Sequence, residues 1–247
     1  MTPSEPPINR GASGAPWPRP VSVIGVGPGD PELLTIRAWK ALRACDLILH
    51  AGPSDRAGFA YETVSTHLRP GQTVEGAGLA MRRGPDDGSV GYDRVAGRLA
   101  DAARSGLKVG FLTEGDPMLF GSGSYVAERL GVVAPDVGVE VIPGVSAVSA
   151  VAARLGWPLA RKDEILTICP ATYHVSEIGV ILDRPGSTCW LKAAGVLPAL
   201  IAELRSRSRL DRAALVERVG RPEERVFRDL TAALEVDLSY FSLVLVR

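Results

Sequence analysis

The sequence predicts an α/β protein with two domains, and three observations support this. Short apolar runs alternate with segments of helical spacing through the first part of the chain, which is typical of a parallel sheet covered by helices. Beyond Trp157 and Pro158, strand-like runs become more frequent and helices fewer. The chain has 247 residues, 46% of them hydrophobic, enough to bury one large core or two smaller ones. We therefore predict a parallel-sheet N-terminal domain (21–155) and a mixed-sheet C-terminal domain (156–247).

In the N-terminal domain, Asp30 stands where a helix N-cap belongs, and Pro31 occupies the first helical position, where its missing N–H costs nothing. The elements expected there are strands at 21–24, 46–49, 108–112 and 139–142, helices at 31–45, 56–68, 92–104, 122–130 and 145–155, and a loop-rich segment at 75–91. The elements expected in the C-terminal domain are strands at 165–169, 188–192, 214–219, 225–228 and 240–246, with a helix at 197–205.

The composition of the chain and its charge balance exclude several classes of protein. Residues 1–20 are rich in Pro, Gly and Ser and contain no apolar core, which excludes a secretory signal peptide and predicts a disordered tail. No stretch approaches the roughly 18 apolar residues that a transmembrane helix needs. Basic and acidic residues are equal at 28 each, so no overall field favours nucleic acid or a membrane surface. The three cysteines are odd in number and far apart, which argues against a disulfide framework and favours a cytoplasmic location.

Three turns follow predicted strands of the parallel sheet, at 25–30, 114–123 and 143–146. Ligands of such sheets gather beyond the carboxyl ends of the strands, so these turns are expected to converge on one crevice.

The first of these turns, Gly25 to Asp30, is not a phosphate-binding loop. It lacks the Gly-Lys-Ser/Thr ending of a P-loop, and its G-x-G-x-G spacing differs from the G-x-G-x-x-G of a dinucleotide fold. Asp30 and Glu32 in the first helical turn would repel a pyrophosphate. Two interpretations remain, a tight capped turn between strand and helix, or a loop that admits a ligand without phosphate.

The second turn, Glu114-Gly115-Asp116-Pro117, also places glycine beside Asp-Pro and contains no cation. Two acidic turns at one sheet edge suit a ligand with positive charge, or one with hydroxyl and amino groups. S-adenosylmethionine carries a sulfonium, an ammonium and a ribose diol but no phosphate, so the pattern permits this ligand.

The motifs GVGPGDPELLT, EGDPMLFGS, VIPGVSAVSAVAARLGWPLARKDEILTICPAT, VERVGRPEERV and YFSLVLVR occur in the order and at the spacing of a known family. Across residues 21–247 the chain resembles the tetrapyrrole methylases. The resemblance implies two α/β domains with the active cleft between them, S-adenosylmethionine as cofactor, a tetrapyrrole of cobalamin biosynthesis as substrate, a homodimer, and no metal.

The resemblance also implies site residues. The first loop (Gly27, Pro28, Gly29) would border the cleft, and the residues expected to hold the cofactor are Pro28, Gly29, Gly115, Asp116, Pro117, Met118, Ser146, Ala147, Pro170, Ala171, Thr172, Lys192 and Ala193. The chain departs from the family at three places: Phe120 replaces a tyrosine, Gly195 stands where an arginine is usual, and His50-Ala51-Gly52-Pro53 replaces a Tyr-Pro element.

Methyl transfer from a sulfonium is an in-line displacement that depends mainly on alignment of the reactants. A proton leaves the substrate afterwards, and Asp30, Asp116 and Glu114 are candidate acceptors, with helix capping as the alternative for Asp30. The resemblance implies a substrate with many carboxylates, for which Arg82, Arg83, Arg161 and Lys162 are candidate partners, with Lys192 as another; solvated surface cations are the alternative.

Other functions stay open at this stage. They are methylation of another ring carbon, a nucleotide-dependent oxidoreductase, and a catalytically silent relative that binds the cofactor. His50, His67 and His174 are dispersed without metal-ligand spacing, and no G-x-S-x-G elbow indicates a hydrolase.

Overall fold

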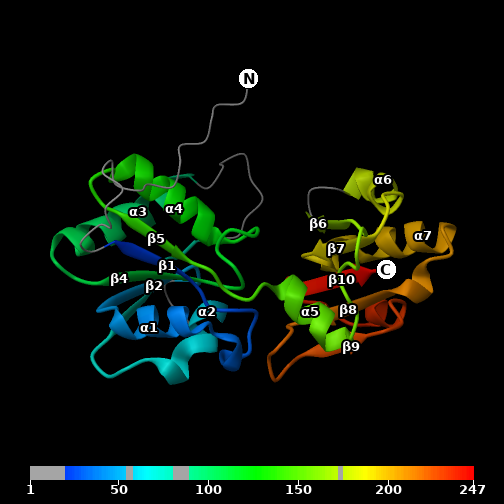
Figure 1. The fold of residues 1–247 in the computed structure, drawn as a ribbon, viewed down its shortest axis with the longest axis horizontal. Coiled ribbons are helices and arrows are strands. Elements are labelled where there is room, and N and C mark those ends of the chain that lie inside the picture. Colours follow the sequence, from blue (N-terminus) through cyan, green and yellow to red (C-terminus); the bar gives the residue numbers. More distant parts are fainter. Residues whose placement is uncertain (1–19, 54–57, 80–88, 172–174) are drawn as a thin grey trace. The chain divides into compact units, whose positions relative to one another are not determined.

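The computed structural model describes residues 20–53, 58–79, 89–171 and 175–247. The chain forms two compact units, one ending at Val145 and the other spanning Ser146–Arg247 (Figure 1). The division lies before helix α5 (Ala147–Leu155), whereas the boundary predicted from the sequence lies after it. The reason is that α5 packs against strand β10 (Ser242–Val246) of the second unit.

The first unit contains a five-stranded sheet in which every pair is parallel, as predicted. Its order is β3-β2-β4-β1-β5, with β1 at Val21–Gly25, β2 at Leu47–His50, β3 at Thr73–Gly76, β4 at Val109–Thr113 and β5 at Val139–Ile142. Because β1 lies between β4 and β5, the carboxyl ends of these three strands are neighbours at one edge.

Helices cover both faces of this sheet (Figure 1). The helices are α1 at Ile36–Ala44, α2 at Phe59–Val64, α3 at Ser89–Arg104 and α4 at Ser122–Val133. Val21 and Val23 point into the core beneath α3 and α4, whereas Ile24 packs with α1 and α2. This alternation follows from the two-residue period of a strand, which here buries apolar side chains on both faces.

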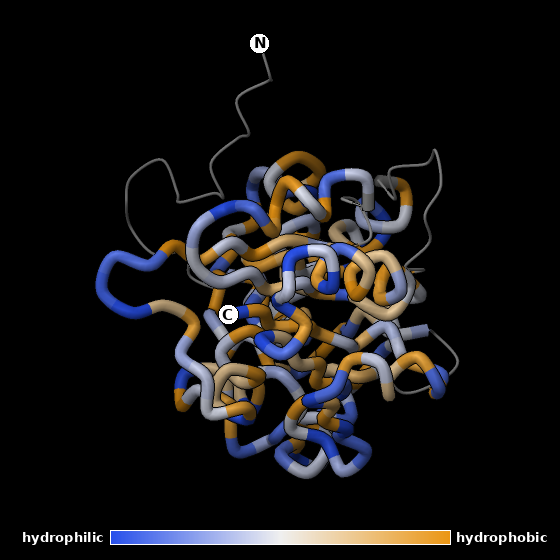
Figure 2. The backbone as a smooth tube through the Cα atoms, turned by 90° about the vertical axis from the view of Figure 1, so that its right-hand side faces the viewer, coloured by the Kyte–Doolittle hydropathy of each residue, from blue (hydrophilic) through white to orange (hydrophobic). Residues whose placement is uncertain are grey.

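The second unit contains a mixed sheet of order β6-β7-β10-β8-β9, also as predicted. Strands β6 (Leu166–Pro170) and β7 (Ser187–Leu191) are parallel, while β10 runs antiparallel to β7 and β8 (Ala213–Glu217), and β9 (Arg225–Phe227) pairs antiparallel with β8. Helices α6 (Ile178–Leu182) and α7 (Leu197–Ser206) pack on Trp190 and Val244. In Figure 2 the hydrophilic segments of the chain lie mostly in the outer turns.

The predicted helix at 31–45 is interrupted. Asp30 caps a short 3₁₀ helix at Pro31–Leu33, Leu34 is extended, and α1 begins at Ile36 with the Thr35 side chain accepting the Ala38 N–H. A second capping residue therefore competes with continuation of the helix. One strand and one α-helix were not predicted: β3, which overlaps the start of the segment interpreted as loop-rich, and α6.

Glycines let the three turns at the carboxyl edge approach one another. A Cβ on Gly144 would lie 2.2 Å from the Gly115 carbonyl oxygen, and one on Gly25 would lie 2.7 Å from the Gly144 nitrogen. The nearest neighbours of Gly25 and Gly144 are therefore backbone atoms of the other turns, together with the Pro117 ring beside Gly25. Gly27 and Gly29 have φ of 82° and 150°, a region that L side chains rarely adopt.

We expect Gly144→Ala to destabilise the protein by about 1–3 kcal/mol, because the added methyl group overpacks a contact between two rigid backbones. Gly131→Ala, inside α4 with nothing within 4 Å of the added Cβ, is the matched control and should stabilise by about 0.5–1 kcal/mol. Urea unfolding followed by circular dichroism measures both. Equal stability of the two variants would contradict the packing described here.

Candidate functional site

The three turns meet at the carboxyl edge of the first sheet, as predicted. Gly27 and Gly115 form an isolated antiparallel bridge, in which the Gly115 N–H donates to the Gly27 carbonyl at 2.7 Å and the Gly27 N–H donates back at 3.3 Å. The Val26 N–H also bonds to the Thr113 carbonyl at 3.0 Å. The first two turns are thus fixed to each other by backbone hydrogen bonds between two glycines of positive φ, 82° at Gly27 and 62° at Gly115.

Asp116 connects the second turn to the third. Its Oδ1 accepts the Met118 N–H at 2.9 Å, and its Oδ2 accepts the Gly144 N–H at 3.1 Å. A hydrogen bond to a carboxylate is stronger than one to a neutral acceptor, so Asp116 holds the second and third turns together effectively. Both of its oxygens are used in that role.

The other two acidic candidates have different surroundings. The Asp30 Oδ1 accepts the Glu32 N–H at 2.9 Å, which confirms the capping interpretation, and the side chain is half-buried. Within the described residues, its Oδ2 has no hydrogen-bond partner. Glu114 reaches α2, where its Oε1 accepts the Ala60 N–H at 3.2 Å.

The remaining residues expected at the cofactor differ in exposure. Pro28, Gly29, Gly115 and Pro117 are buried, so they shape the turns from inside, whereas Met118 is 50% exposed. No Lys or Arg occurs in the turns 25–30, 114–123 or 143–146. This edge therefore offers carboxylates, backbone groups and a thioether side chain. Such a set suits a ligand with cationic and hydroxyl groups better than a phosphate.

In the second unit, predicted residues follow the parallel pair β6 and β7. Pro170 ends β6 and Ala171 is fully buried behind it. Lys192 follows β7 in the left-handed conformation, with φ of 61°, and its Nζ lies 5.2 Å from the centroid of the Tyr240 ring. Ala193 is buried at the start of the next 3₁₀ turn. These positions come together at the carboxyl edge of β6 and β7.

Ser146 caps helix α5, in which Ala147 is the first residue. The Ser146 hydroxyl accepts the Ser149 N–H at 3.2 Å. Its oxygen is therefore engaged in a local cap.

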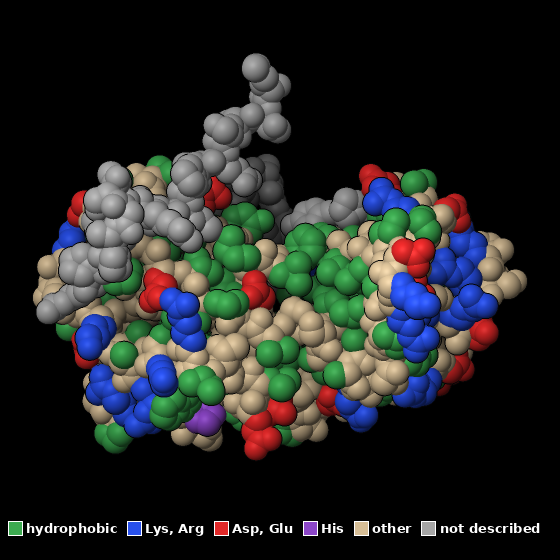
Figure 3. Space-filling model, in the orientation of Figure 1, with side chains coloured by type: hydrophobic (Ala, Val, Ile, Leu, Met, Phe, Trp, Pro, Cys, Tyr) green, Lys and Arg blue, Asp and Glu red, His purple; other side chains and the backbone are tan. Residues whose placement is uncertain are grey.

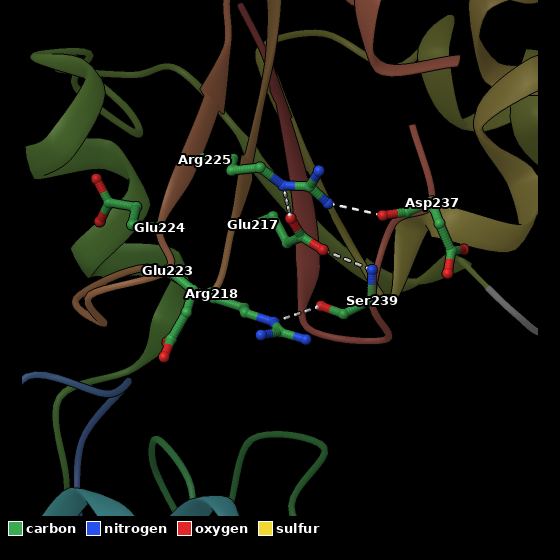
Figure 4. Close-up of a pocket in the computed structure, with 7 residues that line it drawn as sticks. All are labelled: Glu217, Arg218, Glu223, Glu224, Arg225, Asp237 and Ser239. Atoms are coloured by element: carbon green, nitrogen blue, oxygen red, sulfur yellow. Dashed lines mark hydrogen bonds and ion pairs between the residues drawn. The ribbon is translucent and has the colours of Figure 1, made fainter. Parts of the chain in front are cut away.

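A polar cavity of about 440 Å³ lies beside the carboxyl end of β8 (Figure 4). Glu217 is 1% exposed and lies between two donors, the Arg225 guanidinium at 2.5 Å and the Ser239 N–H at 2.5 Å. Burial alone would raise the pKa of Glu217, but these hydrogen bonds outweigh burial and hold the pKa below its ordinary value. Arg225 also donates to the Asp237 carbonyl at 2.7 Å. Glu217 and Arg225 are not among the site residues predicted from the sequence.

Other predicted residues are not brought to these edges. Arg161 and Lys162 are exposed in the turn that precedes β6, so they lie at the opposite edge of the second sheet from Pro170. Arg82, Arg83 and Thr172 lie outside the described residues.

His50 is a residue at the first edge that sequence reasoning considered only for metal binding and as a departure from the family. It ends β2, beside Leu112 of β4, and is 4% exposed. Its Nδ1 accepts the Gly52 N–H at 3.1 Å, and burial lowers its pKa, although Glu62 opposes this. Burial thus favours the neutral ring, and a neutral ring whose Nδ1 accepts a hydrogen bond carries its proton on Nε2. The position of a histidine at the end of a predicted strand was the available signal.

Two features are absent from the described residues. No group of three or more His, Cys, Asp or Glu is arranged to hold a metal ion. None of the described helices has both the length and the apolar character needed to cross a bilayer.

Comparison with known proteins agrees with this architecture. Among solved structures, a cobalt precorrin-4 methyltransferase superposes with a TM-score of 0.72 at 19% identity, covering 92% of this chain and 93% of that one. A uroporphyrin-III C-methyl transferase from Thermus thermophilus, complexed with S-adenyl homocysteine, superposes with a TM-score of 0.61 at 24% identity, covering 92% and 96%. At these identities the likeness shows a shared fold.

Sequence relatives are closer. A precorrin-2 C(20)-methyltransferase from Sinorhizobium sp is 34% identical over 232 residues, which cover 90% of this chain and 93% of that protein. A cobalt-precorrin-2 C(20)-methyltransferase from Salmonella typhimurium is 31% identical, covering 90% and 94%. The model of the Tetrapyrrole (Corrin/Porphyrin) Methylases matches residues 20–235. With this match over most of its length, the chain belongs to the tetrapyrrole methylase family.

Proposed function

We propose that this protein is an S-adenosylmethionine-dependent methyltransferase that methylates precorrin-2, or its cobalt form, at C20. The observation that carries the proposal is the identity of 34% and 31% with the two C(20)-methyltransferases over nearly their whole length. The acidic, phosphate-incompatible turns of the first unit support the same ligand class from physical grounds. The product of the metal-free reaction would be precorrin-3A.

Bound S-adenosylmethionine would supply an electrophilic methyl group, whose bond to sulfur breaks as its bond to the ring carbon forms. The chain's own contribution is alignment and the exclusion of water. In the first unit, Gly115, Asp116 and Met118 are the proposed contacts, with Asp116 holding the turn in shape. Pro170, Ala171, Lys192 and Ala193 stay predictions for the second unit, as do a homodimer and a cytoplasmic location.

Of the three acidic candidates, Asp30 is the one we propose as acceptor of the departing ring proton. Its Oδ2 has no hydrogen-bond partner among the described residues, while both oxygens of Asp116 already accept backbone N–H groups. Asp116 is then a positioning residue. The two roles predict different kinetic consequences.

Asp116→Ala should weaken binding of S-adenosylhomocysteine by at least about tenfold, because the second turn loses its side-chain hydrogen bond to the third. Asp30→Asn should leave that affinity unchanged and lower kcat by at least about tenfold, because it removes only a proton acceptor. Calorimetric titration and steady-state kinetics on both variants measure the split. Asp116→Ala with wild-type affinity, or Asp30→Asn with wild-type kcat, would remove the respective residue from its role.

Incubation of the protein with precorrin-2 and a ¹³C-methyl-labelled donor should place the new methyl group on C20, located by NMR. A parallel reaction with cobalt-precorrin-2 tells which form is accepted. A label on another carbon would replace the substrate assignment. Binding of S-adenosylhomocysteine without transfer to either substrate would instead favour a silent relative, and binding of NAD in its place would overturn the methylase proposal altogether.

A further inference from the structure

A groove of about 410 Å³ lies at the edge of the second sheet where β7 and β8 begin. Its lining is rich in arginine, whereas the turns at the carboxyl edge of the first sheet are acidic. Its residues are Leu182, Asp183, Arg184, Pro185, Gly186, Arg207, Arg209, Arg212 and Arg247. Five of these are arginines and one is a carboxylate. They come from four places in the chain: the end of α6, the end of α7, the residue before β8 and the residue after β10. Figure 3 shows basic side chains gathered over α7.

Two of the arginines are neutralised within the protein. Arg207 donates to both oxygens of Asp183, at 2.7 and 3.1 Å, and also pairs with Glu203, and these partners raise its pKa. Arg247 pairs with Glu164 at 3.1 Å and donates to the Pro158 carbonyl at 2.6 Å. These two side chains are fixed and form walls of the groove.

The other three arginines form no ion pair with a carboxylate in the described part of the chain, although Arg209 lies near enough to Asp183 to help lower the pKa of that carboxyl group. Arg209 uses Nη1 to donate to the Leu182 carbonyl at 2.6 Å, which fixes its guanidinium and leaves other N–H groups available. Arg184 and Arg212 are exposed, and no hydrogen bond or ion pair of their side chains occurs among the described residues. The one carboxylate in the lining, Asp183, is already engaged by Arg207.

We propose that this groove binds an oxyanion of the phosphate class, through Arg184, Arg209 and Arg212. The planar guanidinium presents paired N–H donors that match phosphate oxygens, and three such groups around one hollow exceed the acceptors that the chain provides there. The lining contains no aromatic ring that could stack on a nucleobase. The ligand chemistry is therefore a phosphate group, either inorganic or on a small ester.

The groove is separate from the proposed methyl-donor contacts of the same unit. Leu182 to Gly186 precede β7, whereas Lys192 and Ala193 follow it. A strand rises about 3.3 Å per residue, so the five residues of β7 keep these two edges more than about 13 Å apart. Changes in the groove should consequently leave methyl transfer intact. The inference can therefore be tested independently of the proposed function.

The test is calorimetric titration of the full chain with inorganic phosphate, with glycerol phosphate and with hexaglutamate, at low and raised chloride. Phosphate or its ester should bind in the millimolar range or tighter, and more weakly as chloride rises. Whichever of the two phosphates binds more tightly identifies the source. The Arg184→Ala/Arg212→Ala variant should bind at least about tenfold more weakly, with S-adenosylhomocysteine affinity unchanged.

Lys40→Ala/Arg43→Ala is the matched control, since it removes two exposed positive charges from α1 in the other unit. It should bind phosphate as the wild type does. Three results would overturn the proposal: no phosphate binding at millimolar concentrations, equal weakening in the control, or binding of hexaglutamate in preference to both phosphates. The last would assign the groove to an acidic polypeptide.

Discussion

The arrangement of the first unit depends on the Asp116 carboxylate, which holds two backbone N–H groups from different turns. Met118 belongs to the turn of Asp116 itself, but Gly144 follows β5, a strand that is separated from β4 by β1. One ionised side chain thereby spans the ends of three neighbouring strands. The turns can come close enough for this only because Gly25 and Gly144 have no Cβ.

This constraint changes the meaning of the glycine-rich loop. Its glycines do not leave room for a ligand against the backbone at Gly25, because the Gly144 nitrogen and Pro117 already occupy that space. They allow close packing of the turns, which leaves Met118 exposed, Asp30 half-buried and Glu114 bonded to α2. The edge is acidic because the carboxylates of Asp30, Glu114 and Asp116 accept backbone N–H groups in and beside these turns.

Much of the fold could be predicted from the sequence, because the parallel strands are nearly continuous apolar runs bounded by turn residues. Strand β5 at Val139–Ile142 and both sheet types are examples. Strand β3 could not be predicted, since it is a short edge strand of mixed exposure whose sequence TVEG has little apolar character. The break at Leu34 and Thr35 was hidden because Thr35, the second capping residue, stands inside a helical spacing pattern that continues across it.

The site was less predictable than the fold, because sequence reveals residue types but not which oxygens are engaged. Asp30 and Asp116 look equivalent in the sequence, because each stands between a glycine and a proline. In the structure, however, Asp30 caps a single turn, whereas Asp116 joins two turns. The ion pair between the buried Glu217 and the partly exposed Arg225 depends on the register of β8 with β9, which no local pattern specifies. The arginine groove likewise assembles from four distant segments.

The most direct test of the account is a crystal structure of the protein with S-adenosylhomocysteine. The account predicts that the ligand contacts Gly115 to Met118, with the bonds from Asp116 to Met118 and Gly144 intact. A ligand bound away from this edge of the first sheet, or one that displaces the Asp116 carboxylate from the Gly144 N–H, would contradict it.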